Sequence, residues 1–253
     1  MLEFSWHDAY YSDLQSLYAL LVVPLAFLAW RAASSASARS GVVPAAAPFV
    51  SALTLVFAIE TMLDPIATGP LLKLDAVRGT FVATVVPFVF VLLGDLRVLL
   101  LALGVARPEA GLRSHLQQAL ALSLIVPIVA GSSYALASWI WPDIHGQALW
   151  MIYEFGFFML CVVLGRRWTS EHAPTDPGKA AFLGSLFGYS AAYYALWLTA
   201  DIVIVIGGLD LGWALRMVPN QLYYAFWVPF IYWRFFATAP IALPSVSESN
   251  AAR

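Results

Sequence analysis

Two carboxylic acids, Glu60 and Asp64, stand four residues apart in the segment AIETMLDP, inside a hydrophobic run long enough to cross a bilayer. Ionisable side chains at membrane depth are costly and are therefore candidates for function. Residues four apart share one face of a helix, and at low dielectric two carboxylates there resist ionising together. A neutral carboxylic acid in an apolar site is a proton donor, so we predict a general-acid role for Glu60 and a substrate-binding role for Asp64.

The alternative reading of both acids is structural. Asp64, just before Pro65, would then lie in water at the membrane interface, and Glu60 would form a hydrogen bond to a neighbouring helix.

A third acid, Asp95, and a basic residue, Arg97, lie in the next hydrophobic run, in VLLGDLR. Two positions apart, their side chains point to different faces of a helix and cannot form a simple pair. Arg97 is near enough to the end of the run for its side chain to reach the interface. Asp95 is therefore the catalytic candidate here.

The later runs carry acids and amides among aromatic residues. A stripe in the sixth run includes Asp201, and a stripe in the seventh joins Arg216 to several aromatic rings; a salt bridge between Asp201 and Arg216 is the structural alternative to a site. Amides placed among aromatic residues need partners. We predict Asp201 as a further catalytic acid, and the following as substrate-binding residues: Trp150, Glu154, Tyr194, Trp197, Asn220, Gln221, Tyr224 and Trp227. For Glu154 an interhelical hydrogen bond is the alternative.

These residue types together indicate a water-poor pocket with acids and aromatic walls. Aromatic faces attract a cation without offering a nucleophile that would quench it. Such a pocket suits carbocation chemistry, with a lipophilic small molecule as the partner and no cofactor.

The elements that must position these residues are membrane helices. The chain is 61% hydrophobic and 11% charged, and its apolar residues gather in blocks near 20 residues long. We predict an all-α polytopic membrane protein, a seven-transmembrane-helix bundle over 1–240 with a disordered cytoplasmic tail over 241–253. The predicted helices are 10–31, 43–66, 79–105, 115–141, 147–164, 178–206 and 213–236.

Basic residues predict the orientation, because Lys and Arg in short loops tend to stay cytoplasmic. They follow the first, third, fifth and seventh runs, at Arg31, Arg39, Arg107, Arg113, Arg166, Arg167, Lys179 and Arg234. The N-terminus should therefore face outward and the C-terminus should lie in the cytoplasm. Because the acidic N-terminus lacks the basic start of a signal peptide, we expect the first helix to be retained in an integral, multi-pass protein of the plasma membrane, or of the inner membrane in a bacterium.

Several other functions are disfavoured. The net charge of −2 argues against a nucleic-acid partner, and the single cysteine, Cys161, cannot form an intramolecular disulfide. All four histidines fall at or near helix ends, so we expect no haem and no catalytic zinc. Neither lysine lies in the middle of the seventh run, which argues against a retinal Schiff base.

Three segments resemble the small integral-membrane terpene cyclases of meroterpenoid and indole-diterpene pathways. AIETMLDP is similar to that family's second-helix motif, VLLGDLRVLLLALG to its third helix, and YYAFWVPFIYWRFF to the end of its seventh helix. The resemblance implies seven helices, with Glu60 as the acid that starts cyclisation of a polyprenyl or epoxidised isoprenoid substrate. Where the family carries an acid in the seventh helix, this chain has Asn220 and Gln221.

A second resemblance is to the lysoplasmalogenase family of ether-lipid hydrolases. LLGD, ending at Asp95, and LTAD, ending at Asp201, look like its two Asp motifs. The predicted topology places these acids toward opposite faces, about 15 to 20 Å apart at 1.5 Å per residue, which argues against shared catalysis.

Two further classes of function fit the same residues. Glu60, Asp201 and Arg216 could form the proton- or ligand-coupled site of a transporter or sensor. The chain could also be an accessory subunit of a larger membrane complex.

Overall fold

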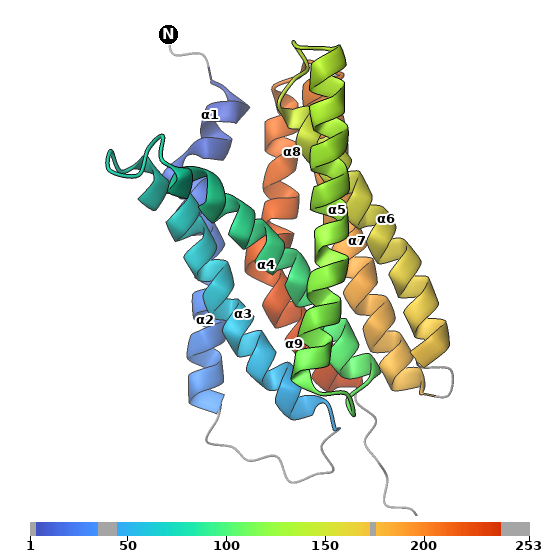
Figure 1. The fold of residues 1–253 in the computed structure, drawn as a ribbon. Helices are drawn as coiled ribbons and strands as arrows, with labels where there is room; N and C mark the ends of the chain where they lie inside the picture. Colours follow the sequence, from blue (N-terminus) through green and yellow to red (C-terminus); the bar gives the residue numbers. More distant parts are fainter. Residues whose placement is uncertain (1–3, 35–44, 173–175, 239–253) are drawn as a thin grey trace, which may run out of the picture.

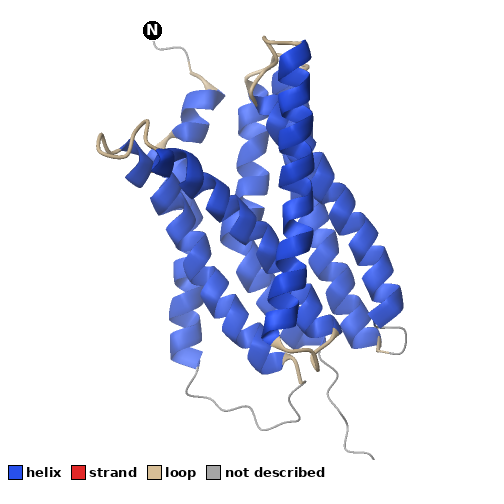
Figure 2. Cartoon of the chain, in the orientation of Figure 1, coloured by secondary structure: helices blue, strands red, loops and turns tan. Residues whose placement is uncertain are grey.

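The computed structural model describes residues 4–34, 45–172 and 176–238, and within these ranges every regular element is a helix (Figure 2). The all-α class is therefore confirmed. The tail predicted to be disordered, 241–253, and Arg39 lie outside the described residues.

The helices follow one another with short connections (Figure 1). In the part of the chain that the structure describes, two π-helical turns, η1 and η3, and one 3-10 turn, η2, lie between or beside the α-helices. In chain order the elements are α1 (Trp6–Tyr11), η1 (Leu14–Tyr18), α2 (Ala19–Ser34), α3 (Ala47–Thr68), η2 (Leu71–Lys73), α4 (Phe81–Ala106), α5 (Leu112–Ile140), α6 (Gln147–His172), α7 (Pro177–Val205), α8 (Leu211–Asn220), η3 (Gln221–Phe226) and α9 (Trp227–Thr238).

Within the described ranges, six helical stretches are long and apolar enough to cross a membrane, which indicates a multi-pass membrane protein. They are Leu14–Ser34, Ala47–Lys73, Phe81–Ala106, Leu112–Ile140, Gln147–Glu171 and Pro177–Val205. The seventh predicted run forms α8, η3 and α9, which succeed each other without a gap over 211–238.

The first predicted helix is divided in the structure. The chain turns at Ser12, whose backbone is extended at ψ 147° and whose hydroxyl donates to the carbonyl of Ala9 over 2.6 Å. A serine that caps the preceding turn in this way competes with helix continuation. Tyr10 consequently belongs to the short helix α1 and not to the first membrane crossing.

The fifth helix is longer than predicted. It continues through the polar segment GRRWTSEH to His172, and Arg167 donates to Glu171 one turn later over 2.7 Å. Such i,i+4 pairs support a helix that has left the apolar region. The next helix, α7, begins after Asp176, whose side chain accepts from the backbone N–H of Lys179.

Successive helices alternate in direction. The ends of α2, α4, α6 and α9 and the starts of α3, α5 and α7 lie at one end of the bundle (Figure 1). That end, which we call the basic end, carries the described basic residues of the predicted cytoplasmic side: Arg31, Arg107, Arg113, Arg166, Arg167, Lys179 and Arg234. The N-terminal helix α1 lies at the opposite end.

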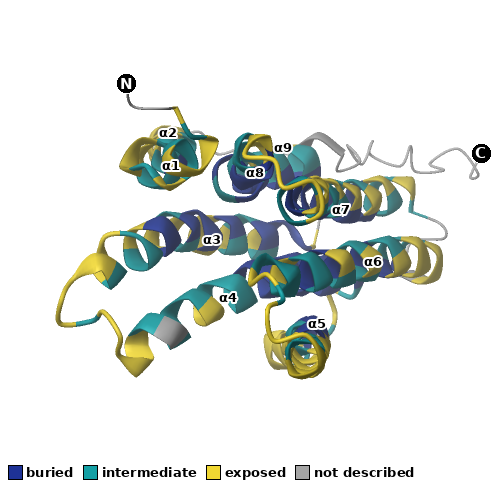
Figure 3. Ribbon diagram, turned by 90° about the horizontal axis from the view of Figure 1, so that it is seen from above, coloured by how far each residue is buried: buried dark blue, intermediate teal, exposed yellow. Residues whose placement is uncertain are grey.

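Buried residues gather between α3, α4, α6, α7 and the α8–α9 segment, whereas α5 lies on the outside and exposes most of its surface (Figure 3). The second half of α4 is the most enclosed part, since Leu101 and Ala102 are fully buried and their neighbours nearly so. Gly104 belongs to this half, and the ring of Phe49 from α3 occupies the place that a side chain there would need. This buried half of α4 begins with Asp95 and Arg97.

Candidate functional site

A cavity of about 150 Å³ lies toward the end of the bundle that carries α1. It is enclosed by α1, α4, α6, α7, α8 and η3, and most of its walls are aromatic. Its lining residues are Tyr10, Val91, Asp95, Trp150, Tyr153, Glu154, Tyr194, Trp197, Arg216, Asn220, Tyr223 and Tyr224.

Asp95 is held in the wall of this cavity by two tyrosines. Tyr153 of α6 donates to one carboxylate oxygen and Tyr194 of α7 to the other. The aspartate is only 2% exposed. Gly94, its neighbour in α4, leaves room for the hydroxyl end of Tyr223. Two donated hydrogen bonds fix the direction of the carboxylate and stabilise its ionised form.

A cluster of charged groups lies beside the cavity, around Arg216. Arg216 forms an ion pair with Asp201, and its Nη1 lies 3.4 Å from Glu154 Oε1. Gln147 at the start of α6 donates to the second oxygen of Asp201 over 2.8 Å. The salt bridge across the α7–α8 connection is therefore present, and it includes a third group, Glu154. Asp201 itself is fully buried behind Arg216 and does not line the cavity.

Asn220 joins three helices. Its Oδ1 accepts from the indole N–H of Trp197 over 2.8 Å, and its Nδ2 donates to the Tyr10 hydroxyl over 3.2 Å. The amide thus has the partners that its aromatic surroundings require. Gln221 begins η3, is half-buried and is not among the cavity's lining residues.

A second polar cluster lies beside the cavity and contains Glu60 and Arg97. Arg97 is fully buried, and its Nη1 lies 3.6 Å from Glu60 Oε2. Its Nη2 donates to the backbone carbonyl of Tyr223 over 2.8 Å. The guanidinium packs between the rings of Tyr223 and Trp227, 4.1 and 4.5 Å from their centroids.

The prediction that Arg97 extends to the interface is therefore wrong. The side chain turns inward because η3 supplies a backbone acceptor and the ring of Tyr223, the start of α9 supplies the ring of Trp227, and α3 supplies a carboxylate. Glu60 lies in this second cluster and is not among the lining residues of the cavity.

Asp64 shares the face of Glu60, as predicted from their spacing, but the alternative that places it in interfacial water is wrong. Asp64 is 2% exposed. Thr68 donates to its carboxylate over 3.3 Å, and Tyr224 lies within hydrogen-bonding reach. Tyr224 also lines the cavity, so it connects Asp64 to the cavity wall.

The structure thus divides the predicted residues among four places. The cavity wall contains Asp95, Trp150, Glu154, Tyr194, Trp197, Asn220 and Tyr224; the adjacent cluster contains Glu60, Asp64 and Trp227; Asp201 lies behind Arg216 and Gln221 lies outside. Sequence reasoning missed Tyr10, Tyr153 and Gln147. Of these, Tyr153 and Gln147 meet acids on other helices, Asp95 and Asp201, and nothing in their own helix indicates these partners.

Within the described ranges, no three His, Cys, Asp or Glu side chains are grouped closely enough to hold a metal ion. Comparison of the chain with protein-family models, with curated proteins and with solved structures gave no match. The geometry of the cavity therefore has to carry the functional argument.

Proposed function

We propose that the protein is an intramembrane enzyme of the terpene-cyclase type, which rearranges an unsaturated isoprenoid or epoxidised isoprenoid through carbocations. The observation that carries this proposal is the position of Asp95. Its carboxyl group is buried in the wall of an aromatic cavity, and each of its oxygens accepts a hydrogen bond from a tyrosine hydroxyl. The resemblance of three helices to the membrane terpene cyclases supports the same chemistry.

The proposed reaction needs a single carboxyl group. The protonated Asp95 transfers its proton to an alkene or epoxide, and the hydrogen bonds from Tyr153 and Tyr194 stabilise the carboxylate that remains. The π electrons of a second double bond attack the cationic carbon and form a ring. The last cation then loses a proton to Asp95, so atoms and charge balance without a cofactor and the acid is regenerated.

The walls of the cavity support the cationic intermediates. Trp150, Trp197 and Tyr223 line it, and aromatic rings stabilise cations without reacting with them. At about 150 Å³ the cavity is smaller than the roughly 300–1,000 Å³ of sites that enclose whole ligands. We infer that it holds only the reacting end of a substrate whose remaining chain extends into lipid.

The family resemblance implies that Glu60 is the acid, whereas we assign Asp95. Glu60 faces the cation of Arg97 and lies outside the cavity, while Asp95 lies within it. Glu60 then acts as a positioning residue, because its partner Arg97 supports the ring of Tyr223 in the cavity wall.

The test is product analysis by mass spectrometry on membranes supplied with plain and epoxidised polyprenyl substrates. Asp95→Asn keeps the shape of the side chain but removes the proton donor, so turnover should fall on the order of 100-fold or more. Asp143→Asn, an exposed aspartate between α5 and α6, is the matched control and should leave turnover unchanged. Turnover by Asp95→Asn at the parental rate per folded molecule would exclude this mechanism.

A second candidate is a ligand-coupled transporter or sensor, favoured by the cluster of Arg216, Glu154 and Asp201. Arg216 and Glu154 line the cavity. The Oε2 atom of Glu154 is buried without a hydrogen bond among the described residues. If the protein is a transporter, Glu154→Gln should abolish the uptake of its ligand into proteoliposomes driven by a pH gradient. Asp95→Asn should retain that uptake. Under the enzyme proposal, no uptake is expected in either case.

We also propose that α8, η3 and α9 form a seventh crossing, which places the N-terminus outside and the C-terminus in the cytoplasm. The distribution of basic residues over the two ends of the bundle supports this orientation. Reporter fusions near Arg107 and Lys179 should be cytoplasmic, and those near Lys73 and Asp143 should be external. An external reporter at Arg107 or Lys179 would overturn it.

A further inference from the structure

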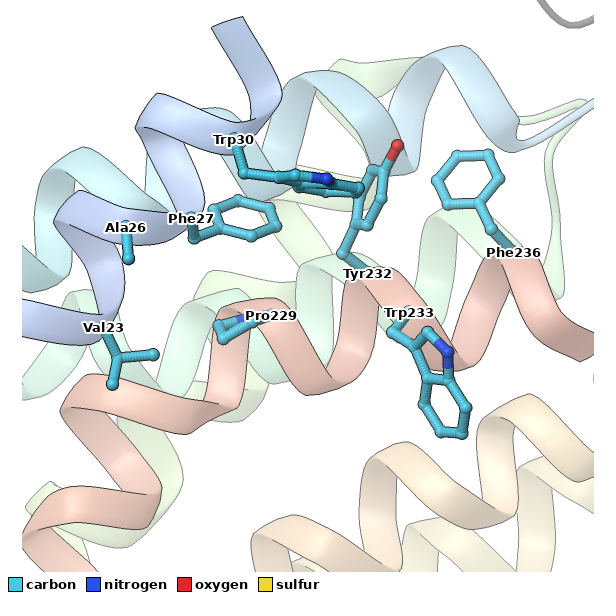
Figure 4. A pocket seen from close by; sticks show the side chains of 8 residues that line it. All are labelled: Val23, Ala26, Phe27, Trp30, Pro229, Tyr232, Trp233 and Phe236. Carbon is cyan, nitrogen blue, oxygen red and sulfur yellow. The ribbon is translucent and has the colours of Figure 1, made fainter. Parts of the chain in front are cut away.

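A groove of about 490 Å³ runs between α2 and α9 toward the basic end of the bundle (Figure 4). It shares no residue with the cavity around Asp95. All of its lining residues come from these two helices and most are aromatic: Val23, Ala26, Phe27, Trp30, Pro229, Tyr232, Trp233 and Phe236. Figure 4 shows the rings of Phe27, Trp30 and Tyr232 gathered on one side of the groove.

A cation lies at the end of this groove. The guanidinium of Arg31 packs 4.4 Å from the centroid of the Tyr232 ring, and its Nη2 donates to the hydroxyl of Ser51 over 2.8 Å. Both partners are uncharged, and within the described ranges no carboxylate forms an ion pair with Arg31. The negative end of the α2 dipole, about half a unit charge, offsets only part of the guanidinium charge.

The groove and the cation together specify the chemistry of an occupant. Val23 and Ala26 lie in an apolar membrane helix, so the groove opens to lipid and favours a hydrocarbon chain. Arg31, one residue beyond Trp30, lies where interfacial aromatic and basic residues meet lipid head groups. An occupant that satisfies both parts has a long apolar chain and an anionic group at one end.

We propose that this groove is a binding site for an anionic glycerophospholipid, with one acyl chain between α2 and α9 and its phosphate on Arg31. The ring of Tyr232 holds the guanidinium from one side and leaves its charge for the phosphate. Because Tyr232 and Tyr223 belong to the same continuous helical segment, the bound lipid contacts the segment that also borders the cavity.

The test is native mass spectrometry of the full-length protein in detergent, supplied with phosphatidylglycerol or phosphatidylcholine of identical acyl chains. The parent should retain phosphatidylglycerol about fivefold better, which is the effect of one basic residue on an anionic lipid. Arg31→Gln should remove this preference. Arg113→Gln, which changes an exposed arginine at the same end away from the groove, is the matched control and should keep it.

A second variant distinguishes the contribution of the groove to lipid binding from that of the Arg31 charge. Ala26→Trp fills the groove but keeps Arg31, so retention of phosphatidylglycerol should fall although the cation is present. Ala26→Trp also tests the site without disturbing the contact between Arg31 and Ser51. The proposal therefore stays testable if Arg31→Gln misfolds.

Several outcomes would overturn the proposal. Equal retention of the two lipids by the parent would exclude a specific anion site. If Arg31→Gln and Arg113→Gln lose the preference for phosphatidylglycerol equally, the preference comes from the net charge of this end of the bundle and not from the groove. Undiminished binding by Ala26→Trp, or full competition by soluble glycerol phosphate, would show that the groove holds no acyl chain. A dimer that Ala26→Trp dissociates would assign the groove to a second copy of the chain instead.

Discussion

The Arg97 guanidinium and the Glu60 carboxylate lie 3.6 Å apart inside the bundle, where Arg97 is fully buried and the Glu60 side chain is 11% exposed. Glu60 is therefore not an isolated acid, and its removal would leave a buried cation without its ion-pair partner, beside a backbone carbonyl and two rings. The pair connects α3 through α4 to η3, three elements that border or support the cavity.

Arg97→Leu should be more destabilising than the double variant Glu60→Gln/Arg97→Leu. Removing one partner of a buried ion pair costs about 3–5 kcal/mol, because the other charge stays desolvated, whereas neutralising both avoids this penalty. Thermal or denaturant unfolding in one detergent, arranged as a double-mutant cycle, measures the coupling. Additive effects would show that the two charges do not interact.

Gly94→Ala should disturb the cavity, because a methyl group there would overlap the hydroxyl end of Tyr223. Tyr223 would have to move away from α4, and both the ligand affinity of the cavity and the stability of the fold should fall. Gly131→Ala in α5 is the matched control, since no atom lies within 4 Å of the position of its added methyl group. That substitution should be neutral or slightly stabilising, by up to about 1 kcal/mol. Equal behaviour of the two variants would contradict the close packing of Tyr223 on Gly94.

Asn220→Leu should remove partners from both Trp197 and Tyr10. The buried indole N–H of Trp197 would be left without its acceptor, which costs about 1–3 kcal/mol, so the free energy of unfolding should decrease by a similar amount. The half-buried Tyr10 hydroxyl keeps its contact with Arg216. Adding Trp197→Phe removes the unsatisfied indole N–H and should restore part of that loss. If the double variant is as unstable as the sum of the single ones, the two side chains do not form the hydrogen bond.

Acid should free the start of α1 from the α7–α8 connection. Asp210, in the α7–α8 connection, accepts from the backbone N–H groups of Trp6 and His7 and from the Ser5 hydroxyl, and the bond from Trp6 is the main reason that the pKa of Asp210 is lowered. A lowered carboxyl pKa contributes stability that is complete above the unfolded value, about 3.9, and is lost as the pH falls through the folded value.

Hydrogen exchange at Trp6 and His7, corrected for the intrinsic rate, measures this release. Both amides should be protected at pH 6 and lose protection below about pH 4. Asp210→Ala should expose them already at pH 6. Protection that persists to pH 2, or that survives in Asp210→Ala, would contradict the role of Asp210.

Most of the membrane helices follow from the sequence, because runs of apolar residues about 20 long report directly on burial in lipid. The division of the first run at Ser12 does not follow in the same way, since it depends on one hydroxyl that caps α1. The π-helical turn η3 is equally invisible to hydrophobicity, because its residues are as apolar and aromatic as those of the flanking helices.

Site residues were predictable where their spacing along one helix places them on a common face. The stripe that joins Arg216 and Asn220 to Tyr224 follows from spacing alone, and so does the shared face of Glu60 and Asp64. The environment of Arg97 does not, because its acceptor is a backbone carbonyl 126 residues away. Tyr153 likewise gains its partner from another helix, and a buried tyrosine gives no sign in the sequence of which acid it meets.

The turn η3 lets the last helical segment tolerate a change of length. A π-helical turn accommodates more residues per turn than an α-helix, so deleting one residue within Gln221–Phe226 would let α8 and α9 join as a regular helix. Because the wide turn already takes up that residue, its loss would leave the direction of α9 nearly unchanged, and Trp227 would still face the guanidinium of Arg97. A one-residue deletion in a regular stretch such as α7 would instead rotate everything after it by about 100°. A single lost codon in α7 would thus misalign both the cavity and the lipid groove, whereas one in η3 would alter mainly the wall that its own residues form.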